Sequence, residues 1–109
     1  MKKYEKILYL DCDIVVLSDL GLLYEQELGD NLVGGVCDYR FDGEYSKRVI
    51  GVETKDYINA GVLLINSLLW RQENIAEKCL EFLREERQLE AYDQDAINFV
   101  SRGRILLLE

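Results

Sequence analysis

Near its start the chain reads Ile7-Leu8-Tyr9-Leu10-Asp11-Cys12-Asp13, four apolar residues that run directly into two acids. A short, continuous apolar run is typical of a strand that is buried on both faces of a mostly parallel sheet. In extended backbone the side chains of residues i and i+2 point to the same side, so Asp11 and Asp13 would face one place. The sequence therefore predicts a buried strand with a pair of carboxylates at its carboxyl end.

These two carboxylates are candidate metal ligands. Held so close, they repel each other unless a cation lies between them. Hard oxygen ligands at a sheet edge suit Mn²⁺ or Mg²⁺, which keep coordination positions open for the phosphates of a substrate. The simpler interpretation, two solvated acids that end a strand, stays open on the motif alone.

The rest of the chain alternates between short apolar runs and helical patterns. Further strands are predicted at 32–37, 62–65 and 105–108, and helices or helical turns at 20–23, 45–49, 68–70, 75–83 and 96–100. Asn66 or Ser67 could cap the helix at 68–70, Asp93 stands at an N-cap position, and Gly103 fits a left-handed helix end. This alternation predicts an α/β domain whose ligands bind beyond the carboxyl ends of its strands.

The composition of the 109 residues narrows the classes of protein. Apolar residues make up 49% of the chain and charged residues 31%, which is enough for a buried core. The net charge of -8 argues against nucleic acid or an anionic lipid surface as a partner. The apolar runs are too short for a transmembrane segment or a signal peptide, so we expect a cytoplasmic protein.

The residue types available for chemistry are restricted as well. The chain contains no histidine, which excludes a Ser/His or Cys/His nucleophile and a histidine metal ligand within it. Its three cysteines, Cys12, Cys37 and Cys79, have no metal-site spacing, and we interpret them as small buried hydrophobes in a reducing compartment. Carboxylates, amides and a bound cation are left to carry any reaction.

Three further segments accompany the first one in a fixed order. They are Tyr57-Ile58-Asn59-Ala60-Gly61-Val62-Leu63-Leu64-Ile65-Asn66, then Trp70, then Tyr92-Asp93-Gln94-Asp95-Ala96-Ile97-Asn98. With these segments the chain closely resembles the family 8 glycosyltransferases, which include bacterial lipopolysaccharide galactosyl- and glucosyltransferases and are related to glycogenin. The resemblance implies a GT-A fold, a Rossmann-like sandwich. It also implies transfer of a hexose, with retention, from a UDP-sugar to a saccharide or glycolipid acceptor, using Mn²⁺ or Mg²⁺.

The resemblance also implies roles for individual residues. Asp11 and Asp13 match the metal-binding acids, where the cation bridges the diphosphate of the donor. Asn59 matches an amide that helps hold the donor sugar. Asp93 and Gln94 match a pair that contacts donor hydroxyls beside the anomeric carbon, and they are the candidate catalytic residues. Asp38, after the second predicted strand, resembles a residue of the sugar-binding region.

Each of these residues also has a simpler interpretation. Asn59 could start a turn, Asp93 could be only an N-cap, Asp95 could complement the helix dipole, and Trp70 could be a packing residue. The joint pattern favours the site roles for Asp11, Asp13, Asn59, Asp93 and Gln94.

The resemblance covers only the central part of a catalytic domain. Domains of this family begin with a strand and helix that bind uracil and ribose, and their third metal ligand is a histidine in a later segment. We therefore interpret residues 1–109 as the central part of one such domain, with a donor site that is incomplete on both sides.

Two alternatives remain. One is a non-catalytic remnant that folds or binds a partner, with an uncovered sheet edge that invites self-association. The other is a haloacid-dehalogenase-like phosphatase, in which a strand also runs into two acids. The bulky Ile14-Val15-Val16 stands against it, because those enzymes continue with Gly-Thr or a similar turn.

A first prediction concerns the 109 residues alone. With Mn²⁺ present, we expect them neither to hydrolyse UDP-glucose or UDP-galactose nor to transfer from them, because the nucleotide pocket and a metal ligand are missing. A chain restored at both ends should be active in the same UDP-release assay. Metal-dependent UDP release by the short chain that disappears on Asp13→Ala would contradict this expectation.

Overall fold

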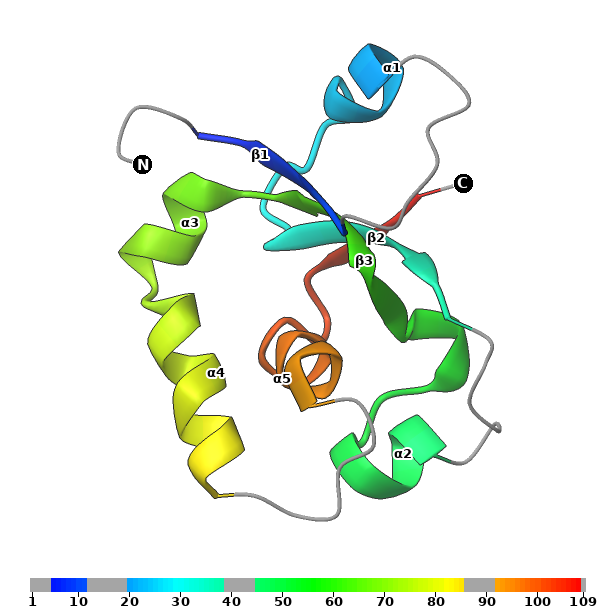
Figure 1. Ribbon diagram of the computed structural model, residues 1–109, viewed down its shortest axis with the longest axis vertical. Coiled ribbons are helices and arrows are strands. Elements are labelled where there is room, and N and C mark those ends of the chain that lie inside the picture. The colour runs from blue at the N-terminus through cyan, green and yellow to red at the C-terminus, as the bar shows by residue number, and fades with distance from the viewer. Residues whose placement is uncertain (1–4, 12–19, 39–44, 86–91, 109) are drawn as a thin grey trace.

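The computed structural model describes residues 5–11, 20–38, 45–85 and 92–108. Within these ranges, four strands form one sheet in the order β1-β3-β2-β4. Figure 1 shows α3, α4 and α5 on one side of this sheet and α1 on the other. In chain order the elements are β1 (Ile7–Leu10), α1 (Leu20–Tyr24), β2 (Val33–Cys37), α2 (Tyr45–Ile50), the 3-10 helix η1 (Thr54–Asp56), β3 (Ile58–Ile65), α3 (Ser67–Gln72), α4 (Ile75–Arg84), α5 (Tyr92–Val100) and β4 (Ile105–Leu107).

The described sheet is mixed, not mostly parallel. The α/β class is confirmed, but β3 runs antiparallel to both of its neighbours, β1 and β2, and only β2 and β4 are parallel. The expectation of a mostly parallel sheet was wrong because a continuous apolar run reports burial on both faces and says nothing about strand direction. As a result, β3 starts at the sheet edge where β1 and β2 end.

Local sequence explains several element boundaries. Asn66 is the N-cap of α3, and its side chain accepts a hydrogen bond from the Leu69 N–H at 3.2 Å. Gly103 follows α5 with a φ of 80°, the left-handed conformation predicted for it. The predicted helical turns near residues 20 and 45 are present as α1 and α2.

Two boundaries differ from the prediction, and both bear on the site. β3 begins at Ile58 instead of Val62, so Asn59 lies within the strand and does not start a turn before it. α5 begins at Tyr92, so Asp93 lies in the first turn of the helix and is not its N-cap.

The core lies between the sheet and its helices. One buried cluster joins the sheet to α4 and consists of Leu32, Val33, Ile58, Leu63 and Ile75. A second joins α2, α4 and α5 and consists of Ile50, Val52, Tyr57, Phe82 and Ala96. Helix α4 is amphipathic as predicted, with Ile75 and Phe82 buried. No helix in the described part of the chain is long and apolar enough to cross a bilayer.

The two described cysteines are partly buried, and neither forms a disulfide. Burial raises the pKa of the Cys79 thiol to about 11, so this group stays protonated at neutral pH. Cys79 packs against the core clusters, which agrees with its interpretation as a small hydrophobe. Cys12 lies outside the described residues.

The contact between Gly35 and Ile58 generates a prediction on stability. A Cβ on Gly35 would lie 2.6 Å from Ile58 Cδ1 and 3.0 Å from its Cβ, at the point where the β2–β3 register shifts. Gly35→Ala should therefore lower the free energy of unfolding by about 1–3 kcal/mol through overpacking. Urea denaturation measures this loss.

Gly34→Ala is the matched control on the same strand. Its Cβ would meet the end of the flexible Leu28 side chain at 3.3 Å, so we expect a smaller loss. Equal losses for the two variants would show that the Ile58 contact does not limit the packing here.

Candidate active site

A cleft of about 520 Å³ opens at the edge where β1 ends and β3 begins. Four of the predicted site residues line it: Asp11, Asn59, Asp93 and Gln94. They come from the end of β1, from β3 and from the first turn of α5, so distant parts of the chain meet here. The opposite end of the cleft is apolar and is lined by Leu63, Ile65, Trp70 and Ile97.

Asp11 is held at the end of β1 by backbone and side-chain contacts. Its N–H donates to the Gly61 carbonyl at 2.8 Å, and its Oδ1 accepts from the Tyr9 hydroxyl at 2.8 Å. A Cβ on Gly61 would lie only 2.9 Å from Asp11 Oδ2. The absence of a side chain at Gly61 therefore lets the carboxylate lie against the β3 backbone, with the residue exposed to solvent.

The two amide side chains are oriented by a buried acid. Asp38 Oδ2 accepts from Gln94 Nε2 at 2.8 Å and from Asn59 Nδ2 at 3.2 Å. Gln94 Oε1 accepts from the Ala60 N–H at 2.9 Å, and Asn59 Oδ1 accepts from the Gly61 N–H at 2.7 Å. Each amide is therefore bonded through both its oxygen and its nitrogen, which fixes its orientation.

Asp38 itself does not line the cleft. It is only 4% exposed, and it lies behind Asn59 and Gln94 at the end of β2. Its expected contact with a sugar stays a prediction, whereas its contact with both amides is part of the structure.

Helix α5 sends neighbouring side chains to different places. Asp93 is exposed and lines the cleft. Asp95 is fully buried, and its carboxylate accepts from the Tyr45 hydroxyl at 2.7 Å and from the Tyr57 hydroxyl at 2.5 Å. Burial and the hydrogen bond to Asp95 raise the pKa of Tyr57 well above its usual value, against a smaller opposing effect of Gln94. The Tyr57 hydroxyl therefore stays protonated and serves as a donor.

Two residues for which no role was predicted, Asn98 and Tyr9, hold neighbouring groups in place. Asn98 pairs with the backbone of Ile58, donating to its carbonyl at 2.8 Å and accepting from its N–H at 2.8 Å. Tyr9 holds Asp11, as above. The i, i+2 spacing of Tyr9 and Asp11 on a strand could have indicated that these two side chains meet. No local signal in the sequence pairs Asn98 with Ile58.

The predicted metal ligands are only partly described. Asp13 lies outside the described residues, so its placement beside Asp11 stays a prediction. The described residues contain no group of three or more acidic, cysteine or histidine side chains placed to hold an ion. What they offer is one exposed carboxylate at the polar end of the cleft, and its hard oxygens suit a divalent cation.

Trp70 packs as the simpler interpretation expected. Its indole Nε1 donates to the Leu32 carbonyl at 3.0 Å, and its ring packs against the sheet cluster while forming part of the apolar end of the cleft.

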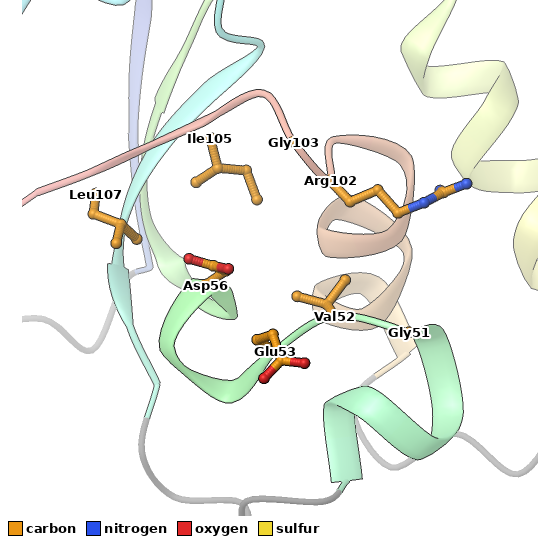
Figure 2. Close-up of a pocket in the computed structure, with 8 residues that line it drawn as sticks. All are labelled: Gly51, Val52, Glu53, Asp56, Arg102, Gly103, Ile105 and Leu107. Atoms are coloured by element: carbon orange, nitrogen blue, oxygen red, sulfur yellow. The ribbon is translucent and has the colours of Figure 1, made fainter.

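A second cavity, of about 390 Å³, lies between η1 and β4 (Figure 2). Val52, Ile105 and Leu107 form its apolar wall, and Glu53 and Asp56 add two acids. It contains none of the predicted site residues, so we assign the candidate site to the first cleft.

Comparisons with known proteins identify relatives of this chain. The chain is 32% identical over 108 residues to a putative glycosyltransferase of Haemophilus influenzae, covering 96% of this chain and 33% of that protein. It is 32% identical over 106 residues to the lipopolysaccharide 1,3-galactosyltransferase of Salmonella typhimurium, covering 88% of this chain and 31% of that protein. The chain thus spans about a third of the length of these relatives.

A solved structure and a family model extend this likeness to the whole chain. The galactosyltransferase LgtC, in complex with donor and acceptor sugar analogues, matches with a TM-score of 0.85 and 35% identity, covering 98% of this chain and 40% of LgtC. The expected partial GT-A fold is thereby confirmed. The family model described as "Glycosyl transferase family 8" matches residues 1–109, and the chain therefore belongs to glycosyl transferase family 8.

Proposed function

We propose that these residues form part of the donor site of a retaining hexosyltransferase, which moves a hexose from a UDP-sugar to a saccharide or glycolipid acceptor. The observation that carries the proposal is the convergence of Asp11, Asn59, Asp93 and Gln94 on one cleft. The galactosyltransferases among the relatives support a hexose as the transferred group, and one of them, named for lipopolysaccharide, supports an acceptor of that kind.

Asp11 is the part of the cleft that would face the diphosphate. A UDP-sugar is anionic and the chain has a net charge of -8, so the two repel each other at long range. Asp11 and Asp13 together would hold Mn²⁺ or Mg²⁺ at the cleft. When bound, the ion supplies positive charge that stabilises the UDP leaving group. Asp11 contributes hard oxygens whose position the Tyr9 hydroxyl and the Gly61 backbone define.

Asn59, Asp93 and Gln94 would face the sugar. The amides of Asn59 and Gln94 are already oriented by Asp38, so they can bond donor hydroxyls with little further loss of rotamer freedom. The exposed Asp93 carboxylate can accept hydrogen bonds from the same sugar. An amide is neither a base nor an acid near neutral pH, so we assign Gln94 to positioning the anomeric carbon and stabilising its developing positive charge through the amide oxygen.

A test of this function uses the natural chain that contains these residues, assayed for UDP release with Mn²⁺, a UDP-hexose and a saccharide acceptor. Asp93→Asn and Gln94→Ala should each lower kcat by about 10²–10³-fold, the usual loss for a group that stabilises developing charge. Glu81→Gln, an exposed acid on α4, is the control and should keep full activity. Wild-type activity in the Gln94→Ala variant would remove Gln94 from the reaction.

A second test addresses the metal. In Gly61→Ala the new Cβ would lie 2.9 Å from Asp11 Oδ2 and 2.8 Å from Asn59 Oδ1, so both side chains must move. We expect Mn²⁺ affinity, measured by electron paramagnetic resonance with UDP present, to fall about tenfold or more, as for the loss of one hydrogen bond to a charged group. Gly34→Ala, away from the cleft, should leave it unchanged. Equal Mn²⁺ affinity in the two variants would place the ion elsewhere.

A further inference from the structure

Asp95 is a buried carboxylate beside the cleft that the proposed reaction does not use. It is 0% exposed, although its neighbour Gln94 and the nearby Asp93 line the cleft. The position in the first turn of α5 suits an acid, because the N-terminal end of a helix carries partial positive charge. This effect alone does not require burial, since an exposed acid in the first turn interacts with the dipole as well.

The Asp95 carboxylate links α5 to α2 and to the start of β3. Tyr45, the first residue of α2, donates to Oδ2, and Tyr57, directly before β3, donates to Oδ1. The Tyr57 carbonyl in turn accepts from the Asp38 N–H at 2.9 Å, at the end of β2. In Figure 1, α2, α5 and the start of β3 lie together. Tyr57 thus ties the Asp95 side chain of α5 to the strand ends that carry Asp38 and Asn59, and Tyr45 ties it to α2.

Asp95, Tyr45 and Tyr57 form a buried polar cluster. Its energetics favour a role in orienting α5 over a role in packing. A carboxylate loses much of its hydration on burial, and well-packed apolar residues in its place are often as stable or more so. The same helix already has apolar contacts, since Phe99 stacks on Phe82 of α4 with ring centroids 4.7 Å apart. Apolar contacts tolerate rotation of a helix about its axis, whereas two hydroxyl donors on one carboxylate require a defined direction.

We propose that Asp95 is a positioning residue. Held by Tyr45 and Tyr57, it sets the rotation of α5 so that Gln94 reaches both Asp38 and the Ala60 N–H and Asp93 lines the cleft. The effect of this positioning on donor binding rests on the function proposed above. The rotation of α5 itself does not depend on that function.

The test compares three variants that each remove a single tyrosine hydroxyl from the natural chain. Tyr57→Phe and Tyr45→Phe each remove one donor to Asp95 and keep the ring in the core. Tyr24→Phe is the matched control, because it removes a hydroxyl that donates to the Lys6 carbonyl at 2.9 Å, on α1 and away from α5. The readouts are the thermal midpoint, the side-chain amide signal of Gln94 in ¹⁵N-glutamine-labelled protein, and KM and kcat for the UDP-hexose.

We expect Tyr57→Phe to shift the Gln94 amide signal and to speed the hydrogen exchange of that amide about tenfold. This factor corresponds to the loss of one hydrogen bond to a charged group. Tyr45→Phe should change the signal in the same direction, and Tyr24→Phe should leave it unchanged even at an equal loss of thermal midpoint. In the active protein, KM for the donor should rise in the first two variants and not in the third.

An unchanged Gln94 signal in both α5-linked variants would overturn the proposal, because the cluster would then contribute only to stability. The amide signal and the kinetics also separate the two hypotheses. A shifted signal in a protein that neither binds nor turns over a UDP-hexose would support the role of Asp95 and contradict the proposed function. Asp95→Asn, which removes the charge itself, is a further variant for the same readouts. The tyrosine variants decide the question without it.

Discussion

The direction of β3 is the constraint on which the candidate site depends. Because β3 runs against both β1 and β2, its first residues lie beside the last residues of its two neighbours. The Asp11 N–H bonds the Gly61 carbonyl, and the Asp38 N–H bonds the Tyr57 carbonyl, so both strand ends are tied to the start of β3. If β3 were parallel to them, its start would lie at the far edge of the sheet, about 23 Å away for a strand of this length. Asn59 could then not meet Asp11.

Helix α5 completes the site through polar contacts with that same strand. Asn98 bonds both backbone groups of Ile58, and Gln94 bonds the N–H of Ala60. These side chains satisfy backbone hydrogen-bonding groups of β3, as a neighbouring strand would. They therefore fix the position of the helix along the strand as well as its distance from it. The buried face of α5 is accordingly polar over one stripe, which consists of Gln94, Asp95 and Asn98, and the buried Ser101 directly follows the helix.

This polar stripe also shows what the sequence could and could not predict. Hydrophobic runs located all four strands of the described sheet, and helical spacing located α4, because both signals are local. Strand direction was missed because burial is compatible with either direction. The partners of Asp95 were missed because Tyr45 and Tyr57 lie far from it in the chain, and a hydrophobic pattern counts a buried acid as exposed. The set of cleft residues was predicted through a family resemblance, whose segments lie in order along the chain, and not through spacing alone.

Burial divides the acids around the cleft into two groups with different chemistry. Asp38 and Asp95 are buried and accept hydrogen bonds from neutral amides and hydroxyls, so each acid orients other side chains. Asp11 and Asp93 are exposed on the cleft, where their oxygens can meet a ligand. A chain with a net charge of -8 that also directs carboxylates into its cleft is poorly suited to an anionic ligand on its own. The same arrangement suits a ligand that brings a divalent cation with it and presents neutral hydroxyls to the remaining acid. A metal-bound nucleotide sugar, the donor proposed above, has both of these properties, so the proposed donor is compatible with the charge of this chain.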